Sequence, residues 1–406
     1  MRILILAGHP FGGLRGRQQQ IAFGLATAGR TVLYVDPFPA EEPGAGQVLP
    51  AWTTREESGV RVLGLAAAPS QPAPATESPA PEGGKTAFHR WSRRVGLLLE
   101  EMNQGDLFRS AEAPASRPAA FDLALVYPPA LLTAAREALK VPIVFDCEED
   151  FPSTAGSRAL ANAYEAALNE GLPLVDGLIA VNRYLVESWG RLLRPGVPRA
   201  VIEHGADLDL FQPPDEKARA QARRDLAVPP AARVAAYVGR LDARVSYEDL
   251  SEILEEEKTL LLLLLGEVND EGRAILERLP SDRVITRGPL PQERVAHLLA
   301  AADLILVPLR REPHLEPQRG LTLYEYLATG LPVVGTFRRA TKAFRDLFYL
   351  YATREELGAA LQAALAETRD APVRAARVAA AREADWGRRV RAVEELFAQV
   401  LQAARR

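Results

Sequence analysis

The sequence predicts an α/β protein of two domains, each built on a parallel β-sheet with helices on both faces. Short apolar runs alternate with helical patterns through most of the chain, as in sheets whose parallel strands are joined by crossover helices. The alternation breaks and restarts at about residues 206–231, and 406 residues are too many for one ordinary core. Hydrophobic and charged fractions of 48% and 25% are those of globular domains.

The apolar runs of the first half place its strands, and the segments between them have helical spacing. The expected strands are 3–7, 31–36, 60–65, 122–127, 142–145, 177–181 and 200–203. The expected helices are 17–28, 131–139, 157–170 and 183–193. In this half the pattern therefore predicts a strand followed by a helix several times over.

The second half repeats the alternation. The expected strands are 234–239, 260–266, 283–286, 303–308 and 332–335, and the expected helices are 247–256, 292–301, 321–328 and 354–367. The stretch 386–405 has apolar side chains at helical spacing and predicts a long amphipathic helix. The second half thus predicts another parallel sheet followed by one long terminal helix.

The breaks in the alternation give the domain boundaries. We expect an N-terminal domain over 1–205, a linker over 206–231, a C-terminal domain over 232–385 and a terminal helix over 386–406. A proline-rich stretch at about 67–87 interrupts the first domain and predicts a mobile surface insertion. The segment 88–102 after it reads either as an amphipathic helix on its own domain or as a helix that touches a membrane surface.

Charge and cysteine content exclude several classes of protein. The net charge of −4 gives no general attraction to nucleic acid, so we expect no nucleic-acid partner. The single cysteine, Cys147, excludes an internal disulfide framework and fits a reducing compartment. The apolar N-terminus is short and reads as a buried strand rather than a signal peptide. These features predict a cytoplasmic protein, with peripheral contact at the inner face of the membrane left open.

The turn after the first strand is rich in glycine and is followed by a helix. Gly12, Gly13 and Arg17 lie there, where backbone amides and a helix N-terminus favour an anion. Two interpretations are open: a loop that faces phosphate or substrate, and glycines that only relieve a tight turn. Asp36 ends the second strand as a ribose-binding acid would, but the turn lacks G-x-G-x-x-G, so dinucleotide binding is the weaker alternative.

Two acidic segments are candidates for catalysis or metal binding. Residues 146–150 follow the fifth strand, where α/β proteins bind ligands, and Glu148 is the carboxylate that we select as catalytic. The alternative is a solvated acidic loop. Asp207 and Asp209 form a D-x-D pattern, but their setting favours a turn that closes the first domain, so we expect no metal site.

Two segments of the second half carry the features of a diphosphate site. Gly239 and Arg240 end the first strand of this domain, and a guanidinium there can pair with a diphosphate. A surface salt bridge to Asp242 or Glu248 is the alternative for Arg240. Further along, Gly320, Leu321 and Thr322 open a helix whose amides can meet phosphate oxygens. Glu325 lies one turn inside, where a carboxylate can accept hydrogen bonds from a ribose diol; an exposed helix acid is the alternative.

Four segments taken in order resemble the family-4 GT-B glycosyltransferases. They are 17–20 with 32–37, 144–152, 202–211 and 324–334, which span nearly the whole chain. The likeness is strongest to the branch of teichuronic acid biosynthesis-type and related polysaccharide glycosyltransferases. The resemblance implies a GT-B fold: two facing Rossmann-like domains with parallel sheets and a cleft between them.

The resemblance also implies a reaction and the roles of residues. It implies metal-independent transfer, usually with retention, of a sugar from a nucleotide-diphosphate sugar to a glycan, lipid-linked or small acceptor, with no cofactor. Donor binding falls in the second domain and acceptor binding in the first, and the terminal helix from Trp386 crosses back onto the first domain. Glu325 takes the ribose role, Gly320, Leu321 and Thr322 supply amides to the diphosphate-sugar, and Arg240 neutralises the leaving group.

The sequence departs from the family pattern at named positions. The family usually has a glutamate eight positions before the ribose-binding one; here that position is Pro317, with Glu316 beside it. The lysine of the donor loop is replaced by Thr322, and the family's loop histidine by a residue of the acidic motif that we match to Glu148. These departures motivate an alternative, a non-catalytic GT-B protein that binds nucleotide-sugar or a partner enzyme. An NAD(P)-dependent oxidoreductase is the weaker one.

Overall fold

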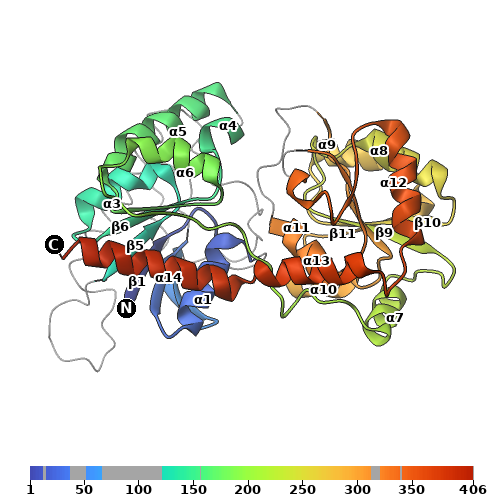
Figure 1. Ribbon diagram of the computed structural model, residues 1–406, viewed down its shortest axis with the longest axis horizontal. Coiled ribbons are helices and arrows are strands. Elements are labelled where there is room, and N and C mark those ends of the chain that lie inside the picture. The colour runs from blue at the N-terminus through green and yellow to red at the C-terminus, as the bar shows by residue number, and fades with distance from the viewer. Residues whose placement is uncertain are drawn as a thin grey trace, which may run out of the picture. The chain divides into compact units, whose positions relative to one another are not determined.

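The computed structural model describes residues 1–11, 15–36, 52–65, 121–155, 157–311, 321–338 and 341–405. The chain divides into two compact units, Met1–Glu203 with Trp386–Arg406, and His204–Asp385. Each unit has its own β-sheet with helices around it and its own apolar core (Figure 1). The prediction of two α/β domains built on parallel sheets is therefore confirmed.

The sheet of the first unit has eight strands among the described residues. From one edge to the other they are β3 (Trp52–Glu57), β4 (Val60–Leu65), β2 (Thr31–Val35), β1 (Arg2–Leu6), β5 (Leu123–Val126), β6 (Ile143–Cys147), β7 (Gly177–Ala180) and β8 (Arg199–Val201). All neighbouring pairs are parallel except β3 and β4, which form an antiparallel hairpin. The hairpin places one antiparallel strand at the edge of a sheet that the sequence predicts as parallel.

The sheet of the second unit has six strands in its described part, and all neighbours are parallel. The order is β11 (Val284–Arg287), β10 (Leu260–Leu265), β9 (Arg233–Val238), β12 (Leu304–Val307), β13 (Val333–Thr336) and β14 (Tyr349–Tyr351). Strand β10 consists of six leucines, of which only one is not fully buried. A continuous apolar run of this kind is the sequence of a strand that helices cover on both faces.

Helices follow the strands in both units. The first unit contains α1 (Arg17–Thr27), α3 (Leu132–Ala138), α4 (Phe151–Thr154), α5 (Arg158–Gly171), α6 (Arg183–Trp189) and α14 (Trp386–Ala403). The second contains α7 (Glu216–Asp225), α8 (Tyr247–Glu256), α9 (Asp270–Leu276), α10 (Gln292–Leu299), α11 (Leu321–Thr329), α12 (Arg354–Ala366) and α13 (Pro372–Glu383).

Side-chain caps fix where several of these helices begin. Ser157 accepts a hydrogen bond from the backbone N–H three residues on, and so do Asn182, Asp215, Ser246 and Asn269. Each cap satisfies a backbone donor that has no partner inside its helix, which contributes typically about 1 kcal/mol. The boundaries of α5, α6, α7, α8 and α9 therefore follow from local chemistry.

Both sheets have a position at which the strand order reverses. In the first unit β1 lies between β2 and β5, and in the second β9 lies between β10 and β12. Crossover connections leave such a strand in opposite directions, so a crevice opens beyond its carboxyl end, where open α/β sheets bind ligands. The segments after Leu6 and Val238 are therefore where each unit should hold a ligand.

The terminal helix α14 packs on the first unit, against α1 and β7. Six of its side chains are buried, at the spacing of one helix face: Trp386, Val390, Val393, Leu396, Phe397 and Val400. Arg30 also bonds to Glu394 across this interface, at 2.6 Å between Nε and Oε1. The close approach of α14 to α1 depends on Gly24, because a Cβ at this position would lie 2.4 Å from Val390 Cγ2.

Replacing Gly24 by alanine tests this interface. In the native chain we expect Gly24→Ala to lower the free energy of unfolding by roughly 1–3 kcal/mol, because the β-branched Val390 cannot rotate away. In a Val390→Ala background the same change should instead stabilise by up to about 1 kcal/mol, the helix propensity of alanine over glycine. Denaturant titrations of the four variants measure both effects, and equal effects in the two backgrounds would contradict this packing.

Several features differ from the expected elements or lie outside the described residues. Strands β3 and β14 and helices α9 and α13 were not expected, since each is short or has weak periodicity. Residues 206–231, assigned above to a linker, belong to the second unit and contain α7. The proline-rich stretch 67–87 and the segment 88–102 lie outside the described residues. No helix of the described part is both long and apolar enough to cross a membrane.

Candidate functional site

The strands of the second unit end in closely stacked glycines. Gly239 and Gly266 follow β9 and β10 with φ of +154° and +153°. A Cβ at Gly266 would lie 2.0 Å from the carbonyl oxygen of Gly239, which only glycine allows. The Gly239 N–H donates to the Leu265 carbonyl, 2.9 Å away. This edge of the sheet therefore presents backbone where other residue types would present side chains.

Glu325 lies on α11 and is buried, with 8% of its surface exposed. Gln292 Nε2, at the start of α10, donates a hydrogen bond of 2.7 Å to Glu325 Oε1. The next residue, Tyr326, anchors α11 to the sheet: its hydroxyl donates to Val238 O at 2.7 Å and accepts from Val238 N at 3.2 Å. The helix that carries Glu325 is thus bonded to the last residue of β9, two positions before Arg240.

The environment of Glu325 favours its neutral form. Burial raises the pKa of Glu325 to about 8, the charge of Asp207 adds to the rise, and the Gln292 hydrogen bond opposes it. The exposed-acid alternative for Glu325 is therefore wrong, because a buried carboxyl with a specific partner lies at this position. A group with such a shift at the ligand-binding edge of an α/β sheet is a candidate for a functional role.

Arg240 follows Gly239 and is partly exposed. Its Nε lies 3.6 Å from Glu267 Oε2, while Asp242 is paired with Arg244. The salt-bridge alternative named Asp242 or Glu248, and Glu267 is a further acidic partner that it did not name. The Tyr237 hydroxyl donates to the Arg240 carbonyl at 3.0 Å and so fixes the turn that carries it.

The beginning of α11 is described only in part. Leu321 and Thr322 are its first two residues, where backbone N–H groups have no acceptor within the helix. Gly320, which precedes them, lies outside the described residues, as do Glu316 and Pro317. Of the expected donor residues, the described part therefore places Gly239, Arg240 and Glu325 in one unit, at or beside the end of β9.

In the first unit, Arg17 is fully buried against Asp146. Its Nε lies 3.1 and 2.9 Å from the two carboxylate oxygens, and its Nη1 donates to the Glu203 carbonyl at 3.1 Å. Burial raises the pKa of Asp146, and the Arg17 guanidinium opposes that rise. Arg17 therefore ties the start of α1 to the end of β6, while Gly12 and Gly13 lie outside the described residues.

Glu148 and the first turn form a second polar cluster in this unit. Gln18 donates to Glu148 at 2.8 Å through Nε2, and its Oε1 accepts from the backbone of Gly8 and His9 at 2.8 and 3.1 Å. His9 Nε2 lies 3.4 Å from Glu148 Oε1. Asp146 and Glu148 are 0% and 4% exposed, so the solvated-loop interpretation is wrong for these two carboxylates.

Two further candidates have structural partners. Asp36 accepts hydrogen bonds from the Phe11 backbone at 2.6 Å and from Arg55 at 3.1 Å, so it holds the first turn in place. Asp207 accepts from the backbone of Asp209 and Leu210, both at 3.2 Å, as the turn interpretation requires. Among the described residues, no group of three or more His, Cys, Asp or Glu side chains is placed to hold a metal ion.

Sequence reasoning missed Gln292, Gln18 and His9. Gln292 belongs to a helix 33 positions away from Glu325, and nothing in its local pattern marks it as a partner. His9 lies in the turn already singled out and Gln18 in the first turn of the helix after it, so a search for side chains able to reach residues 146–150 could have found them. Each acts on a carboxylate that the sequence did identify.

Comparison with known proteins finds a family match for part of the chain. Residues 232–367 match the family described as glycosyl transferases group 1. A D-inositol 3-phosphate glycosyltransferase from Corynebacterium urealyticum is 32% identical over 34% of this chain and 34% of its own length. A Bacillus subtilis protein named as a teichuronic acid biosynthesis glycosyltransferase, TuaH, is 23% identical over 60% of this chain and 64% of its own. The chain thus spans about a third of the first relative and under two thirds of the second.

Solved structures share the fold along the whole chain. Sucrose-phosphate synthase from Thermosynechococcus elongatus superposes with a TM-score of 0.69 at 20% identity, over 99% of both chains. Anabaena HepE in complex with UDP superposes with a TM-score of 0.65 at 17% identity, over 98% of this chain and 100% of that one. Residues 232–367 of this protein are therefore similar to the glycosyl transferases group 1 family, and the whole chain shares the two-domain GT-B fold.

Proposed function

We propose that the protein transfers a sugar from a nucleotide-diphosphate sugar to a glycan, lipid-linked or small acceptor. The observation that carries the proposal is the bonding of α11 to the end of β9 in the matched domain, through Tyr326 beside Glu325 and Val238 two positions before Arg240. We take Glu325, Arg240 and the first turn of α11 as one site. They offer a carboxyl for a ribose diol, a guanidinium for a diphosphate and helix amides for the remaining phosphate oxygens. Anabaena HepE, which shares the fold, was solved with UDP.

In this proposal the transfer needs no metal ion and retains configuration at the sugar carbon. The departing nucleoside diphosphate develops about two negative charges, and fixed donors aimed at developing charge make a large contribution to catalysis. Arg240 and the positive end of α11 would supply that compensation. Glu148, held by Gln18 and close to His9, is the carboxylate that we assign to the acceptor side.

The role of Glu325 predicts that donor binding depends on pH. A ribose diol donates to an ionised carboxylate, whereas the pKa of Glu325 in the ligand-free protein is raised to about 8. Below that pH binding must first remove a proton, at about 1.4 kcal/mol per pH unit. We expect a nucleoside diphosphate to bind about tenfold more weakly at pH 7 than at pH 9, measured by titration calorimetry. In Glu325→Gln the affinity should no longer change with pH.

The same carboxyl makes the stability of the second unit pH-dependent. Between pH 4.5 and about 8 the folded chain keeps a proton that the unfolded chain has released. The free energy of unfolding should therefore fall as the pH rises through this window, and Glu325→Gln should lessen the fall. If Glu325→Gln left both the binding profile and the stability profile as steep as in the native protein, the assigned role would be wrong.

A non-catalytic protein that binds nucleotide-sugar is the second candidate. The observation that favours it is Pro317, which occupies the position of a family glutamate. Calorimetry and product analysis separate the two functions. A nucleotide-sugar that binds without transfer or hydrolysis, across the donors that bind, would support the second candidate and overturn the first.

A further inference from the structure

A cavity of about 420 Å³ opens at the opposite edge of the second unit's sheet, and the proposed transfer reaction does not use it. Its lining includes Arg233 at the first position of β9, Asp303 directly before β12 and Pro332 directly before β13. Strands of four to six residues at about 3.3 Å per residue put roughly 13–20 Å between this edge and the one beside Glu325. The volume lies within the range of about 300–1,000 Å³ that small-molecule sites occupy.

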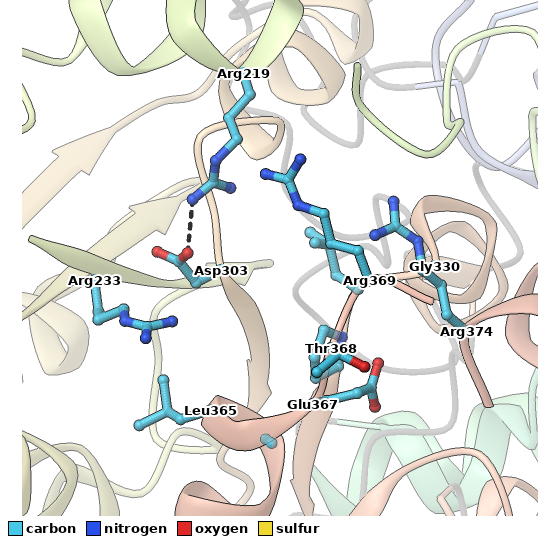
Figure 2. A pocket seen from close by; sticks show the side chains of 12 residues that line it. Arg219, Arg233, Asp303, Gly330, Leu365, Glu367, Thr368, Arg369 and Arg374 are labelled. Carbon is cyan, nitrogen blue, oxygen red and sulfur yellow. Dashed lines mark hydrogen bonds and ion pairs between the residues drawn. The ribbon is translucent and has the colours of Figure 1, made fainter. Parts of the chain in front are cut away.

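Arginines dominate the charged lining of this cavity. Arg219 enters from α7, Arg233 from β9, Arg369 from the segment between α12 and α13, and Arg374 from α13, and Figure 2 shows the four around one open space. Only two carboxylates, Asp303 and Glu367, line the same cavity. Four cations against two anions leave an excess of positive charge around this cavity, where Arg233 and Arg369 are exposed to solvent.

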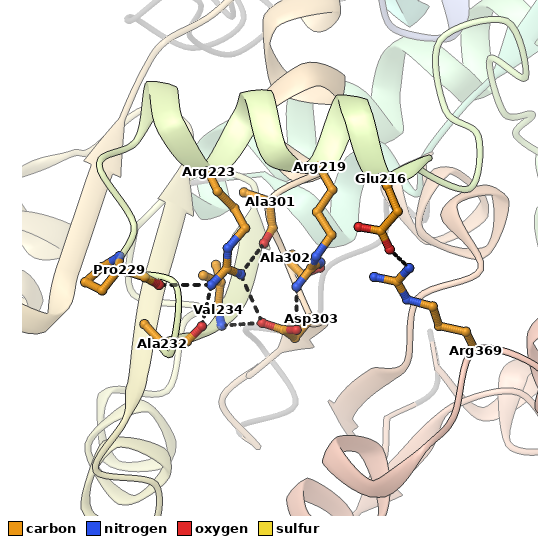
Figure 3. Close-up of polar contacts among 10 residues, drawn as sticks. All are labelled: Glu216, Arg219, Arg223, Pro229, Ala232, Val234, Ala301, Ala302, Asp303 and Arg369. Carbon is orange, nitrogen blue, oxygen red and sulfur yellow. Dashed lines mark hydrogen bonds and ion pairs between the residues drawn. The ribbon is translucent and has the colours of Figure 1, made fainter.

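Both carboxylates are already neutralised. Asp303 bonds to Arg219 at 2.6 Å and lies 3.5 Å from Arg223, and it also accepts from the Val234 backbone at 2.8 Å (Figure 3). Glu367 is bonded by both terminal nitrogens of the fully buried Arg377, at 2.6 and 2.7 Å. Both carboxylates of the cavity are therefore already paired with arginines that also stabilise the fold.

These arginines stabilise the fold through further hydrogen bonds to backbone carbonyls. Arg219 and Arg223 donate to the carbonyls of Ala302, Ala301 and Ala232, and so fasten α7 to the sheet (Figure 3). Arg377 donates to the carbonyls of Leu347 and Gly330. Stability of the fold therefore explains Arg219, Arg223 and Arg377, and it leaves three lining arginines without such an explanation.

The other three arginines have fewer or weaker polar partners. Arg369 pairs with Glu216, but both side chains are more than 60% exposed, and such pairs contribute little to stability (Figure 3). In the described part of the chain no hydrogen bond or ion pair to a side chain is found for Arg233 or Arg374. Partial burial lowers the pKa of Arg374, the neighbouring Arg369 and Arg377 lower it further, and the charge of Glu367 opposes them. The guanidinium groups around Arg374 thus repel one another, and Glu367 acts against this repulsion.

We propose that this cavity binds a phosphorylated small molecule carrying at least two negative charges, through Arg233, Arg369 and Arg374. Guanidinium groups present planar, paired donors that match phosphate oxygens, and they stay charged at all physiological pH values. A ligand that brings two or more charges neutralises the excess of the cavity and can replace Glu216 as the partner of Arg369. The site lies at the amino ends of the strands, so it is separate from the donor edge.

Pyrophosphate is the probe for this site, titrated by calorimetry into the full chain. Arg240→Ala serves as the background, because that change removes the proposed diphosphate contact at the donor edge. In this background pyrophosphate should bind with a Kd below about 1 mM, and Arg233→Ala with Arg374→Ala should weaken binding at least tenfold. A pyrophosphate Kd that is unchanged in the pocket variant, or an absence of binding in the background protein, would overturn the proposal.

A matched control separates the pocket from net charge. Arg382→Ala with Arg273→Ala removes two positive charges from exposed positions on α13 and α9 of the same unit, outside the cavity lining. It should leave the pyrophosphate Kd within about twofold, and an equal loss in this control would show that charge alone sets the affinity. If the alanine pocket variant fails to fold, Arg233→Lys with Arg374→Lys keeps the charge without the planar fork, and its affinity should also fall. Because donor turnover is not measured, the result stands apart from the proposed transferase activity.

Discussion

Arg240→Ala should lower kcat for sugar transfer by about 10²-fold or more, provided that the protein is the proposed transferase. Removal of one fixed donor from developing negative charge costs on the order of 10²–10³-fold in comparable enzymes. Arg240 lies two positions after the end of β9, on the turn fixed by Tyr237. Its pairing with Glu267 at 3.6 Å is long enough for a diphosphate to compete.

Steady-state kinetics of nucleoside diphosphate release measure this effect. Arg240→Lys should recover part of the rate, since it restores the charge without the forked donors. Arg273→Ala, an exposed arginine on α9, is the matched control and should leave kcat unchanged. Normal turnover in purified Arg240→Ala would remove Arg240 from the mechanism.

Asp146→Asn should destabilise the first unit by about 3–5 kcal/mol, because it leaves the fully buried Arg17 without its counter-charge. None of the chain's four tryptophans falls within the second unit, His204–Asp385, and the described Trp189 and Trp386 belong to the first. Tryptophan emission during denaturant titration therefore follows the first unit alone, although the two-unit chain need not unfold in a single step.

Two variants make the stability test specific. Arg183→Ala breaks an exposed ion pair with Glu187 in the same unit and should leave the tryptophan transition unchanged. Arg17→Met with Asp146→Leu replaces both charges by apolar groups and should be more stable than Asp146→Asn alone. A transition in Asp146→Asn that matches that of the Arg183→Ala control would show that the pair contributes nothing.

Much of the fold could be predicted from the sequence because local hydrophobic patterns mark most of its strands and helices. Six leucines in succession mark β10 as a buried parallel strand, and the spacing from Trp386 marks a long amphipathic helix. The element that α14 packs on is not encoded in that spacing; only the family resemblance suggested the first domain. The edge strand β3 was missed because its residues, WTTREE, lack the apolar run that marks the other strands.

In the candidate site, too, residues with a local sequence signal could be predicted, whereas contacts between distant residues could not. Glu325 and Arg240 could be selected as candidates because each stands at a recognisable place in the sequence, one turn into a helix after glycine and at the end of a strand. The burial of Arg17 could not be foreseen, since its partner Asp146 lies 129 positions away. The arginine-lined cavity is assembled from α7, β9 and the segments around α12 and α13, so no window of the sequence contains it.

Titration calorimetry of UDP, GDP, ADP and TDP against the full chain tests the donor site most directly. We predict that at least one of these nucleotides binds with one site per chain. Glu325→Ala should weaken that binding about tenfold or more, as expected when a charge-assisted hydrogen bond is lost, whereas Glu148→Gln in the first unit should not. Affinity that is unchanged in Glu325→Ala, or the failure of all four nucleotides to bind, would contradict a nucleotide-sugar site at the end of β9.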